Sequence, residues 1–356
     1  MKTKLNKQKI IDKYCGGLIN YLLVPFKGSK TNHSVIIYKL DAIGDAVLSL
    51  PMIKYLKEQT NFRIIIACSK SNLSVFKNHK FIDKILIFNS SKLDIKDLIK
   101  NIKELRKEKA RFSIDTAQSS NISAIISFIT AKQNIGFKKT KGKSRNHIYV
   151  YPIELDPNKH MIYNYFDLLK PLGINTPKKV ELVSLNKKKF PKKEKVVAVH
   201  PCNIFPYKYW SKERWVEIIE YLALKNEVLI LGSKEESPMV KELLENVKSK
   251  RVLNLSGRTN INDLIKIMPK FKLLIGLDGG LMHIASSMQI STVSLFGHVD
   301  PIRYAPFNKK SIALYNPPLC SPCVKNYDNQ ETKCTNPICF DKISVKDVKE
   351  AIDKLI

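Results

Sequence analysis

The sequence predicts an α/β protein made of two Rossmann-like domains with parallel sheets. Short runs rich in β-branched residues alternate with stretches of helical periodicity, which is typical of parallel α/β units. The strand-like runs are almost continuously apolar, which indicates sheets that are buried on both faces. The length of 356 residues also favours two domains over one.

The strand-like runs fall into two series. The first series comprises Ser34–Leu40, Phe62–Cys68, Lys84–Phe88 and Arg111–Asp115. The second series comprises Val196–His200, Glu227–Leu231, Val252–Asn254, Leu273–Leu277 and Thr292–Phe296. Because ligands of such sheets bind beyond the carboxyl ends of the strands, we expect the functional residues in the strand-to-helix loops.

A charged stretch with one proline and no apolar periodicity separates the two series, so it is predicted to be a linker. The chain divides accordingly into a basic amphipathic segment (1–33), a first Rossmann-like domain (34–185), the linker (186–195), a second Rossmann-like domain (196–340) with a cysteine-rich loop (317–340), and a final helix (341–356).

The amino-terminal segment has apolar residues at helical spacing between Ile10 and Leu23, with lysines beside them. We interpret it as an amphipathic helix that either packs on its own domain or lies on a membrane surface. No run of the sequence approaches the ~18 apolar residues of a membrane span, and no small-residue cleavage site marks a secretory signal.

The chain is strongly basic, because 61 Lys and Arg against 32 Asp and Glu give a net charge of +29. Three explanations stay open: lysine-rich codon bias, an anionic lipid or membrane partner, and a nucleic-acid partner. The lysines are spread along the chain instead of forming arginine-rich stripes, which argues against nucleic acid.

The first candidate loop is KLDAIGDAVLSLP, residues 39–51, directly after the first strand. Gly44 is suited to a tight turn, and Asp45 lies where a helix N-terminus favours a carboxylate. Asp41 and Asp45 serve either as a cap and a first-turn carboxylate or as groups that act on a substrate. The loop lacks the G-x-G-x-x-G fingerprint, which disfavours a dinucleotide-dependent oxidoreductase.

The second candidate loop is HPCNIFPYKYWSKERW, residues 200–215, after the first strand of the second series. Lys208 lies just before a predicted helix, where its flexible stem is able to reach a phosphate. The alternative is one solvated lysine among many. In the loop GSKEE, Glu235 or Glu236 also follows a strand and is placed to accept hydrogen bonds from ribose hydroxyls.

The third candidate loop is GLDGGLMHIA, residues 276–285. Here Gly279 and Gly280 follow Asp278 and open a helix, so that an anion is able to approach the exposed N–H groups closely. His283, in the first turn of that helix, adds a donor to the same anion. A packed core histidine is the alternative.

With these loops in place, the chain resembles glycosyltransferase family 9, the group that includes the ADP-heptose:lipopolysaccharide heptosyltransferases. The resemblance covers about residues 34 to 306 and rests on KLDAIGDAVLSLP, HP…KYWSKERW and GLDGGLMHIASSM…SLFGHVDP, in register on the expected loops. It implies a GT-B fold, in which an amino-terminal acceptor domain and a carboxyl-terminal nucleotide-sugar domain face a central cleft. It also implies inversion of the anomeric centre without a catalytic metal.

The resemblance implies roles for single residues as well. Asp45 matches the family's proposed general base, whereas Asp41 stands at a more variable position. Lys208 matches a lysine that binds the donor phosphates, and Glu235 or Glu236 loosely matches a ribose-binding glutamate in a loop of different length. The motif that receives the diphosphate matches Asp278, Gly279, Gly280 and His283.

One departure from the family concerns Gly279, where many members have Thr or Ser. The side-chain hydroxyl is lost here, so the backbone N–H groups would have to serve alone. The chemistry suits the remaining residue types, because inversion needs a carboxylate to take the acceptor's proton and cations or N–H groups to stabilise the departing diphosphate. Closure of the domains would bring these groups together and exclude water.

A cysteine-rich pattern, C-x2-C-x10-C-x4-C, ends the second domain. Four thiolates at this spacing suit a structural zinc ion, but unligated thiols and a disulfide stay open as alternatives. The four residues are Cys320, Cys323, Cys334 and Cys339.

The sequence therefore predicts a cytoplasmic enzyme, peripheral to the inner membrane, that transfers a heptose or related sugar from ADP-heptose. The expected acceptor is the lipopolysaccharide core or another anionic lipid-linked saccharide. No catalytic cofactor and no nucleic-acid partner are expected. The alternatives are a family 9 transferase that uses another nucleotide sugar and, from a different class, a basic nucleic-acid-binding protein.

Overall fold

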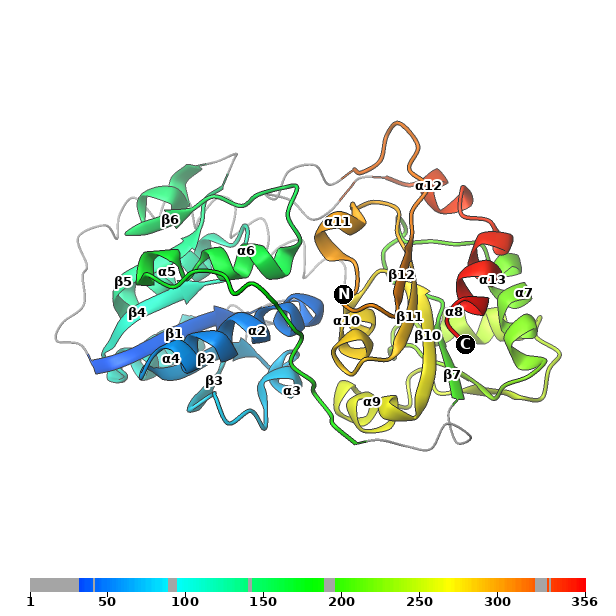
Figure 1. Ribbon diagram of the computed structural model, residues 1–356, viewed down its shortest axis with the longest axis horizontal. Helices are drawn as coiled ribbons and strands as arrows, with labels where there is room; N and C mark the ends of the chain where they lie inside the picture. Colours follow the sequence, from blue (N-terminus) through cyan, green and yellow to red (C-terminus); the bar gives the residue numbers. More distant parts are fainter. Residues whose placement is uncertain are drawn as a thin grey trace. The chain divides into compact units, whose positions relative to one another are not determined.

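The computed structural model describes residues 32–40, 42–88, 95–139, 143–188, 196–323, 332 and 334–356. Most of the predicted amphipathic segment, Asp41 and most of the predicted linker lie outside these residues, whereas Asn32 and His33, which were assigned to that segment, begin the first strand. The described chain forms two compact units, which meet in sequence between Glu181 and Leu182. Each unit holds one six-stranded parallel sheet with helices on both faces (Figure 1). Among the described residues, no helix combines the length and the apolar character that crossing a bilayer requires.

The sheet of the first unit has the strand order β3-β2-β1-β4-β5-β6, and all its pairs are parallel. This is the strand order of the Rossmann fold, and the direction of winding reverses between β1 and β4. The strands are β1 (Asn32–Lys39), β2 (Arg63–Ser69), β3 (Lys84–Phe88), β4 (Ala110–Asp115), β5 (Ala131–Phe137) and β6 (Tyr151–Ile153).

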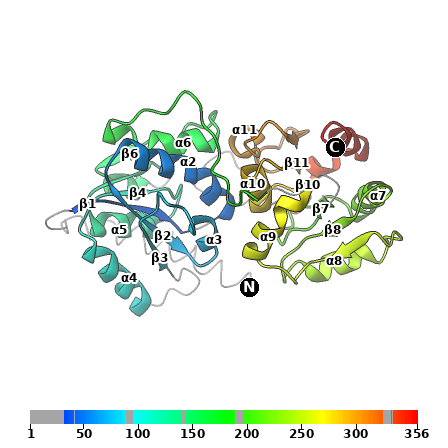
Figure 2. The same ribbon diagram turned by 60° about the horizontal axis from the view of Figure 1, so that its bottom comes forward.

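The helices of the first unit are α2 (Ile43–Gln59), α3 (Leu73–Phe76), α4 (Ile95–Lys107), α5 (Asn121–Thr130) and α6 (Met161–Asp167). Helix α2 packs against α6, and most of its residues from Asp45 to Leu56 are buried. Figure 2 shows α2 and α6 over one face of the sheet and α4 over the other. Two 3₁₀ segments, Lys143–His147 and Lys170–Leu172, complete the unit.

The second unit repeats the same winding. Its strand order, β12-β11-β10-β7-β8-β9, again reverses direction between the first and fourth strands of the unit, β7 and β10. The strands are β7 (Val196–His200), β8 (Val228–Ile230), β9 (Val252–Asn254), β10 (Phe271–Leu277), β11 (Ser291–Leu295) and β12 (Ser311–Leu314).

The helices of the second unit surround a core that contains both tryptophans of the chain. Trp210 and Trp215 pack edge to face at 4.8 Å, and the indole N–H of Trp210 donates to the carbonyl of Ile343, which holds the carboxyl-terminal segment on this core. The helices are α7 (Lys212–Ala223), α8 (Ser237–Leu244), α9 (Ile261–Ile267) with the 3₁₀ turn Met268–Lys270, α10 (Gly280–Ser287), α11 (Pro301–Tyr304), α12 (Ile338–Asp341) and α13 (Val345–Asp353).

The prediction of two Rossmann-like domains is confirmed, and each of the nine strand-like runs forms a strand. Three strands were missed. Strand β5 carries Lys132, Gln133 and Asn134 and so lacks the apolar run of its neighbours. Strands β6 and β12 have only three and four residues and lie at sheet edges, where one side of the strand needs no partner.

Candidate active site

The candidate residues of the first unit lie at the carboxyl end of β1, where the winding of the first sheet reverses. Asp45 occupies the first turn of α2 and is only 8 % exposed. The tight turn before the helix is made at Ala42, whose φ of 55° is left-handed, whereas Gly44 lies inside the helix. The expectation that Gly44 makes the turn is therefore wrong. Such strained backbone at a non-glycine residue is typical of functional loops.

The carboxylate of Asp45 is held by a tyrosine from a distant part of the sequence. The hydroxyl of Tyr165, in α6, donates a hydrogen bond to Asp45 Oδ1 at 2.7 Å. Tyr165 is fully buried. The sequence analysis missed this residue, because 120 positions separate the two partners and α6 follows no strand of the sheet directly.

Lys39 ends β1 beside this pair and is only 5 % exposed. Its ammonium nitrogen lies 6.0 Å from the centroid of the Tyr165 ring. Among the described residues no carboxylate forms an ion pair with it. A nearly buried cation that forms no ion pair with a described carboxylate is costly, so Lys39 is a candidate for contact with an anionic ligand.

The loop that follows β4 is fixed against the same end of the sheet. Thr116 donates to the carbonyl of Tyr38 from its N–H, at 3.2 Å, and from its hydroxyl, at 2.6 Å. Asp115, the last residue of β4, accepts hydrogen bonds from Tyr149 at 2.6 Å and from Arg145 at 3.0 Å, and all three residues are buried. This network anchors the loop at the point where α/β sheets bind their ligands.

The candidate residues of the second unit lie at the carboxyl ends of β7 and β10. Lys208 donates from Nζ to the Asp278 carbonyl at 3.0 Å and to its carboxylate at 3.2 Å. The two side chains are 13 % and 12 % exposed. The structure thus brings together two residues that the sequence analysis found in separate loops.

The charge state of Asp278 follows from its neighbours. Burial by itself would raise the pKa of this carboxyl, but the charge of Lys208, the electrostatic influence of His298 and His283 and the Lys208 hydrogen bond outweigh burial, so the pKa is lowered. Asp278 is therefore ionised, and Lys208 keeps a fixed position at the end of β10.

The N-terminus of α10 opens directly after this ion pair. Gly279 is fully extended, with φ of 176°, and a Cβ atom there would meet only the Leu277 carbonyl oxygen, at 3.7 Å. Gly280 is the first residue of the helix, and His283 lies in its first turn with 4 % exposure. Exposed backbone N–H groups beside Lys208 form an arrangement that suits a diphosphate.

The structure distinguishes between the two glutamates of the β8–α8 loop. Glu236 is buried, and its Oε2 accepts from the Ser233 N–H at 2.7 Å and lies 3.2 Å from His200 Nε2. Burial opposes ionisation, but the His200 and Ser233 hydrogen bonds and the His200 charge lower the pKa of Glu236. Glu235 is exposed. Glu236 is thus the glutamate that the structure fixes beside β7.

His298, in the loop after β11 of the second unit, is a further residue that the sequence analysis did not name as a site residue. It is 4 % exposed, and its ring lies 5.0 Å from that of Tyr207. Burial and the charge of Lys208 lower the pKa of His298 to about 3, against the attraction of Asp278. The His298 imidazole is therefore neutral at pH 7, so it does not compete with Lys208 as the cationic partner of Asp278.

The cysteine-rich loop does not present a metal cage among the residues that the structure describes, since no group of three or more His, Cys, Asp or Glu lies close enough to hold an ion. Cys323 Sγ donates to the Cys320 carbonyl, and Cys334 Sγ donates to the Asn336 carbonyl. Burial first, and then the neighbouring Cys323 and Cys334, raise the pKa of the Cys339 thiol to about 11. The zinc site stays a prediction from residue spacing.

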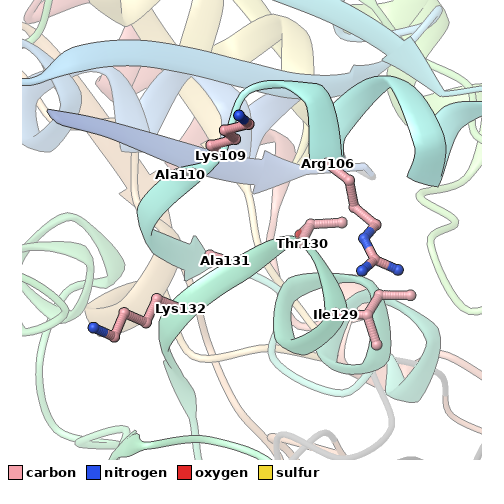
Figure 3. Close-up of a pocket in the computed structure, with 7 residues that line it drawn as sticks. All are labelled: Arg106, Lys109, Ala110, Ile129, Thr130, Ala131 and Lys132. Atoms are coloured by element: carbon pink, nitrogen blue, oxygen red, sulfur yellow. The ribbon is translucent and has the colours of Figure 1, made fainter. Parts of the chain in front are cut away.

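A small basic pocket lies at the opposite edge of the first sheet, where β4 and β5 begin. It has a volume of about 30 Å³ and is lined by Arg106, Lys109, Ala110, Ile129, Thr130, Ala131 and Lys132. Figure 3 shows Arg106 beside Ile129, and the Lys132 side chain points away from both of them. Because ligands of parallel sheets bind at the carboxyl edge, this pocket is not part of the candidate site.

Comparison with known proteins identifies the family of the chain. Residues 98–334 match the model of glycosyltransferase family 9 (heptosyltransferase). Lipooligosaccharide heptosyltransferase 2 of Campylobacter jejuni is 25% identical over 86% of this chain and 96% of its own length. Lipopolysaccharide heptosyltransferase 3 of Escherichia coli K12 is 21% identical over 88% of this chain and 95% of its own length.

Two solved structures share the fold. E. coli ADP-heptose lps heptosyltransferase II superimposes with a TM-score of 0.72 and 16% identity, over 90% of this chain and 98% of its own. E. coli heptosyltransferase WaaC with ADP-2-deoxy-2-fluoro heptose gives 0.71 and 14% identity, over 90% of this chain and 99% of its own. The family match covers about two thirds of the chain, and the chain therefore belongs to glycosyltransferase family 9 (heptosyltransferase).

Proposed function

We propose that this protein transfers a heptose from ADP-heptose to the lipopolysaccharide core or to a related lipid-linked saccharide, with inversion and without a catalytic metal. The observation that carries the proposal is the partly buried Lys208–Asp278 pair at the opening of α10, on the carboxyl edge of the second sheet. The names of the relatives, which are lipopolysaccharide and lipooligosaccharide heptosyltransferases, support the choice of sugar and acceptor.

The second unit supplies the groups for the donor. We assign to Lys208 and the first N–H groups of α10 the charge that develops on the departing diphosphate, and His283 adds a donor in the first turn. We assign the ribose hydroxyls of the donor to Glu236, which Ser233 and His200 hold beside β7. We assign neutralisation of the diphosphate to these groups.

The first unit supplies the base. We assign to Asp45 the removal of the acceptor's hydroxyl proton while the acceptor oxygen attacks the anomeric carbon.

The distribution of charge supports an anionic acceptor. Residues 1–181, which include the proposed acceptor unit, carry 33 Lys and Arg against 14 Asp and Glu. Residues 182–356 carry 28 against 18. The larger excess, +19 against +10, is thus on the acceptor side. We propose that the protein works in the cytoplasm at the surface of the inner membrane, where a basic protein is attracted to anionic lipid.

Calorimetric titration with ADP, UDP and GDP tests the donor. We expect micromolar binding of ADP alone, and a weakening of about tenfold or more in Lys208→Ala, because a charge-assisted contact with phosphate is lost. Lys212→Ala is the matched control, since Lys212 pairs with Glu242 at the surface. Preference for UDP or GDP would replace heptose by another sugar within the same family, which is the alternative function.

Replacement of Asp45 by Asn tests the base. The change keeps the shape of the side chain and removes its ability to accept a proton, so turnover is expected to fall by about 100-fold or more. Binding of ADP is expected to stay within about twofold of the unmodified protein, because the proposed donor residues lie in the other unit. Normal turnover by this variant would show that another group acts as the base.

A further inference from the structure

We propose that Tyr165 is a positioning residue for the reaction: its hydroxyl occupies Oδ1 of Asp45 and thereby selects Oδ2 as the atom that takes the acceptor's proton. The inference rests on the proposed role of Asp45 as base. It starts from the 2.7 Å hydrogen bond between Tyr165 and Asp45, which joins two helices 120 positions apart in sequence.

The two oxygens of the Asp45 carboxylate differ in their surroundings. Oδ1 accepts the Tyr165 hydroxyl, whereas no described residue donates a hydrogen bond to Oδ2. The side chain keeps 8 % of its surface exposed. When Oδ1 is engaged by Tyr165 and no described residue bonds to Oδ2, the carboxylate presents Oδ2 as its acceptor atom in one orientation. Proton transfer requires such an acceptor within hydrogen-bond distance of the proton.

Tyr165 itself is held firmly. It is fully buried, its ring centroid lies 6.2 Å from that of Phe137, and the Lys39 ammonium lies 6.0 Å from it. The neighbouring Asn164 side chain donates to the carbonyls of Asp156 and Lys159 and accepts from the Asp156 N–H, which fixes α6 on the preceding loop. A site supported by packed elements in this way loses little precision to motion.

The step that this geometry serves is a balanced displacement. The acceptor's O–H bond breaks and its proton moves to Asp45 Oδ2, while the acceptor oxygen forms a bond to the anomeric carbon of the donor. The bond from that carbon to the diphosphate oxygen breaks, and the nucleoside diphosphate leaves with the electron pair. Tyr165 exchanges no proton in this step, because its hydroxyl hydrogen stays on the bond to Oδ1.

The variant Tyr165→Phe tests the inference, because it removes the hydroxyl and keeps the ring that packs in the core. We expect kcat to fall by about tenfold or more, with the donor KM and the calorimetric Kd for ADP within about twofold. Tyr38→Phe is the matched control: Tyr38 is an equally buried tyrosine of the same unit, but its hydroxyl bonds to Thr130, so kcat is expected to stay near the unmodified value.

A double-mutant cycle separates positioning from a merely structural role. If Tyr165 acts through Asp45, Tyr165→Phe has no further effect on the residual single-turnover rate of Asp45→Asn. The inference is overturned if kcat of Tyr165→Phe stays within twofold of the unmodified protein, or if the substitution lowers the rate equally in both backgrounds. Full turnover by Asp45→Asn alone would instead overturn the proposed base, so the two failures are distinguishable.

Discussion

At the scale of single residues, the buried side chain of His298 is expected to make the free energy of unfolding depend on pH. Its pKa falls from the ordinary 6.5 to about 3 in the folded protein because of burial and the charge of Lys208. Between these two values the unfolded chain binds more protons than the folded one. The free energy of unfolding therefore decreases as the pH falls through this window, and it recovers above pH 6.5.

His298→Asn is expected to flatten that dependence between about pH 6.5 and 4.5, where the unmodified protein loses up to about 1.4 kcal/mol per pH unit from this group. Denaturant unfolding followed by tryptophan fluorescence measures it, since Trp210 and Trp215 both lie in the core of the second unit. Parallel curves for the two proteins would mean that His298 does not carry the pH dependence.

At the same scale, the residues that were found and missed differ in one respect. Asp45, Lys208 and Asp278 lie between the end of a strand and the first turn of the helix that follows it, where the sequence pattern identifies them. His298 also lies in such a segment, after β11, but only its burial beside Lys208 and Asp278 distinguishes it. Tyr165 carries no local signal, because its partner Asp45 is 120 positions away in sequence. Lys39 was visible as a charged residue at the end of an apolar strand, but only burial distinguishes it from the many solvated lysines.

Among the elements, β10 and the start of α10 differ in whether they have space for a side chain at their glycines. A Cβ atom at Gly276 would lie 2.8 Å from the His200 carbonyl oxygen, whereas at Gly279 it would meet only the Leu277 carbonyl oxygen, at 3.7 Å. Gly276 is therefore required by the close approach of β10 to β7. Gly279, with its extended backbone, is not.

We expect Gly279→Ser to be tolerated and to tighten ADP binding by about two- to fivefold, because it adds a hydroxyl donor at the start of α10. Gly276→Ala is expected to destabilise the protein by about 1–3 kcal/mol, as overpacking does. Calorimetry and denaturant unfolding measure the two effects. Weaker ADP binding by Gly279→Ser would mean that the diphosphate fills the space beside that residue.

The cysteine-rich loop is an element whose role rests on spacing alone. If it binds zinc, metal analysis of the purified protein is expected to give about one zinc per chain, and Cys323→Ser and Cys334→Ser each to abolish it. Cys68→Ser is the control, since Cys68 is buried in β2. Metal-free protein in which Cys320, Cys323 and Cys334 react with a thiol reagent would leave unligated thiols as the explanation.

For the whole molecule, the net charge of +29 is the property with the most direct consequence. We expect binding to vesicles that contain anionic phospholipid and a loss of about tenfold or more in affinity as salt rises from low to physiological concentration. Vesicles of neutral lipid are the control. Equal binding to both kinds of vesicle would contradict an electrostatic attraction, and tighter binding to a DNA duplex would favour the nucleic-acid alternative.

The sequence by itself determined the fold class, because apolar β-branched runs that alternate with helical periodicity are compatible only with buried parallel sheets. It also placed the functional loops, since Asp45, Lys208 and Asp278 each lie between the end of a strand and the first turn of the next helix. Tertiary structure alone decided which side chains meet: Lys208 with Asp278, Glu236 with His200, and Tyr165 with Asp45. The physical reason is that periodicity is local, whereas burial and hydrogen bonding depend on which distant segments pack together.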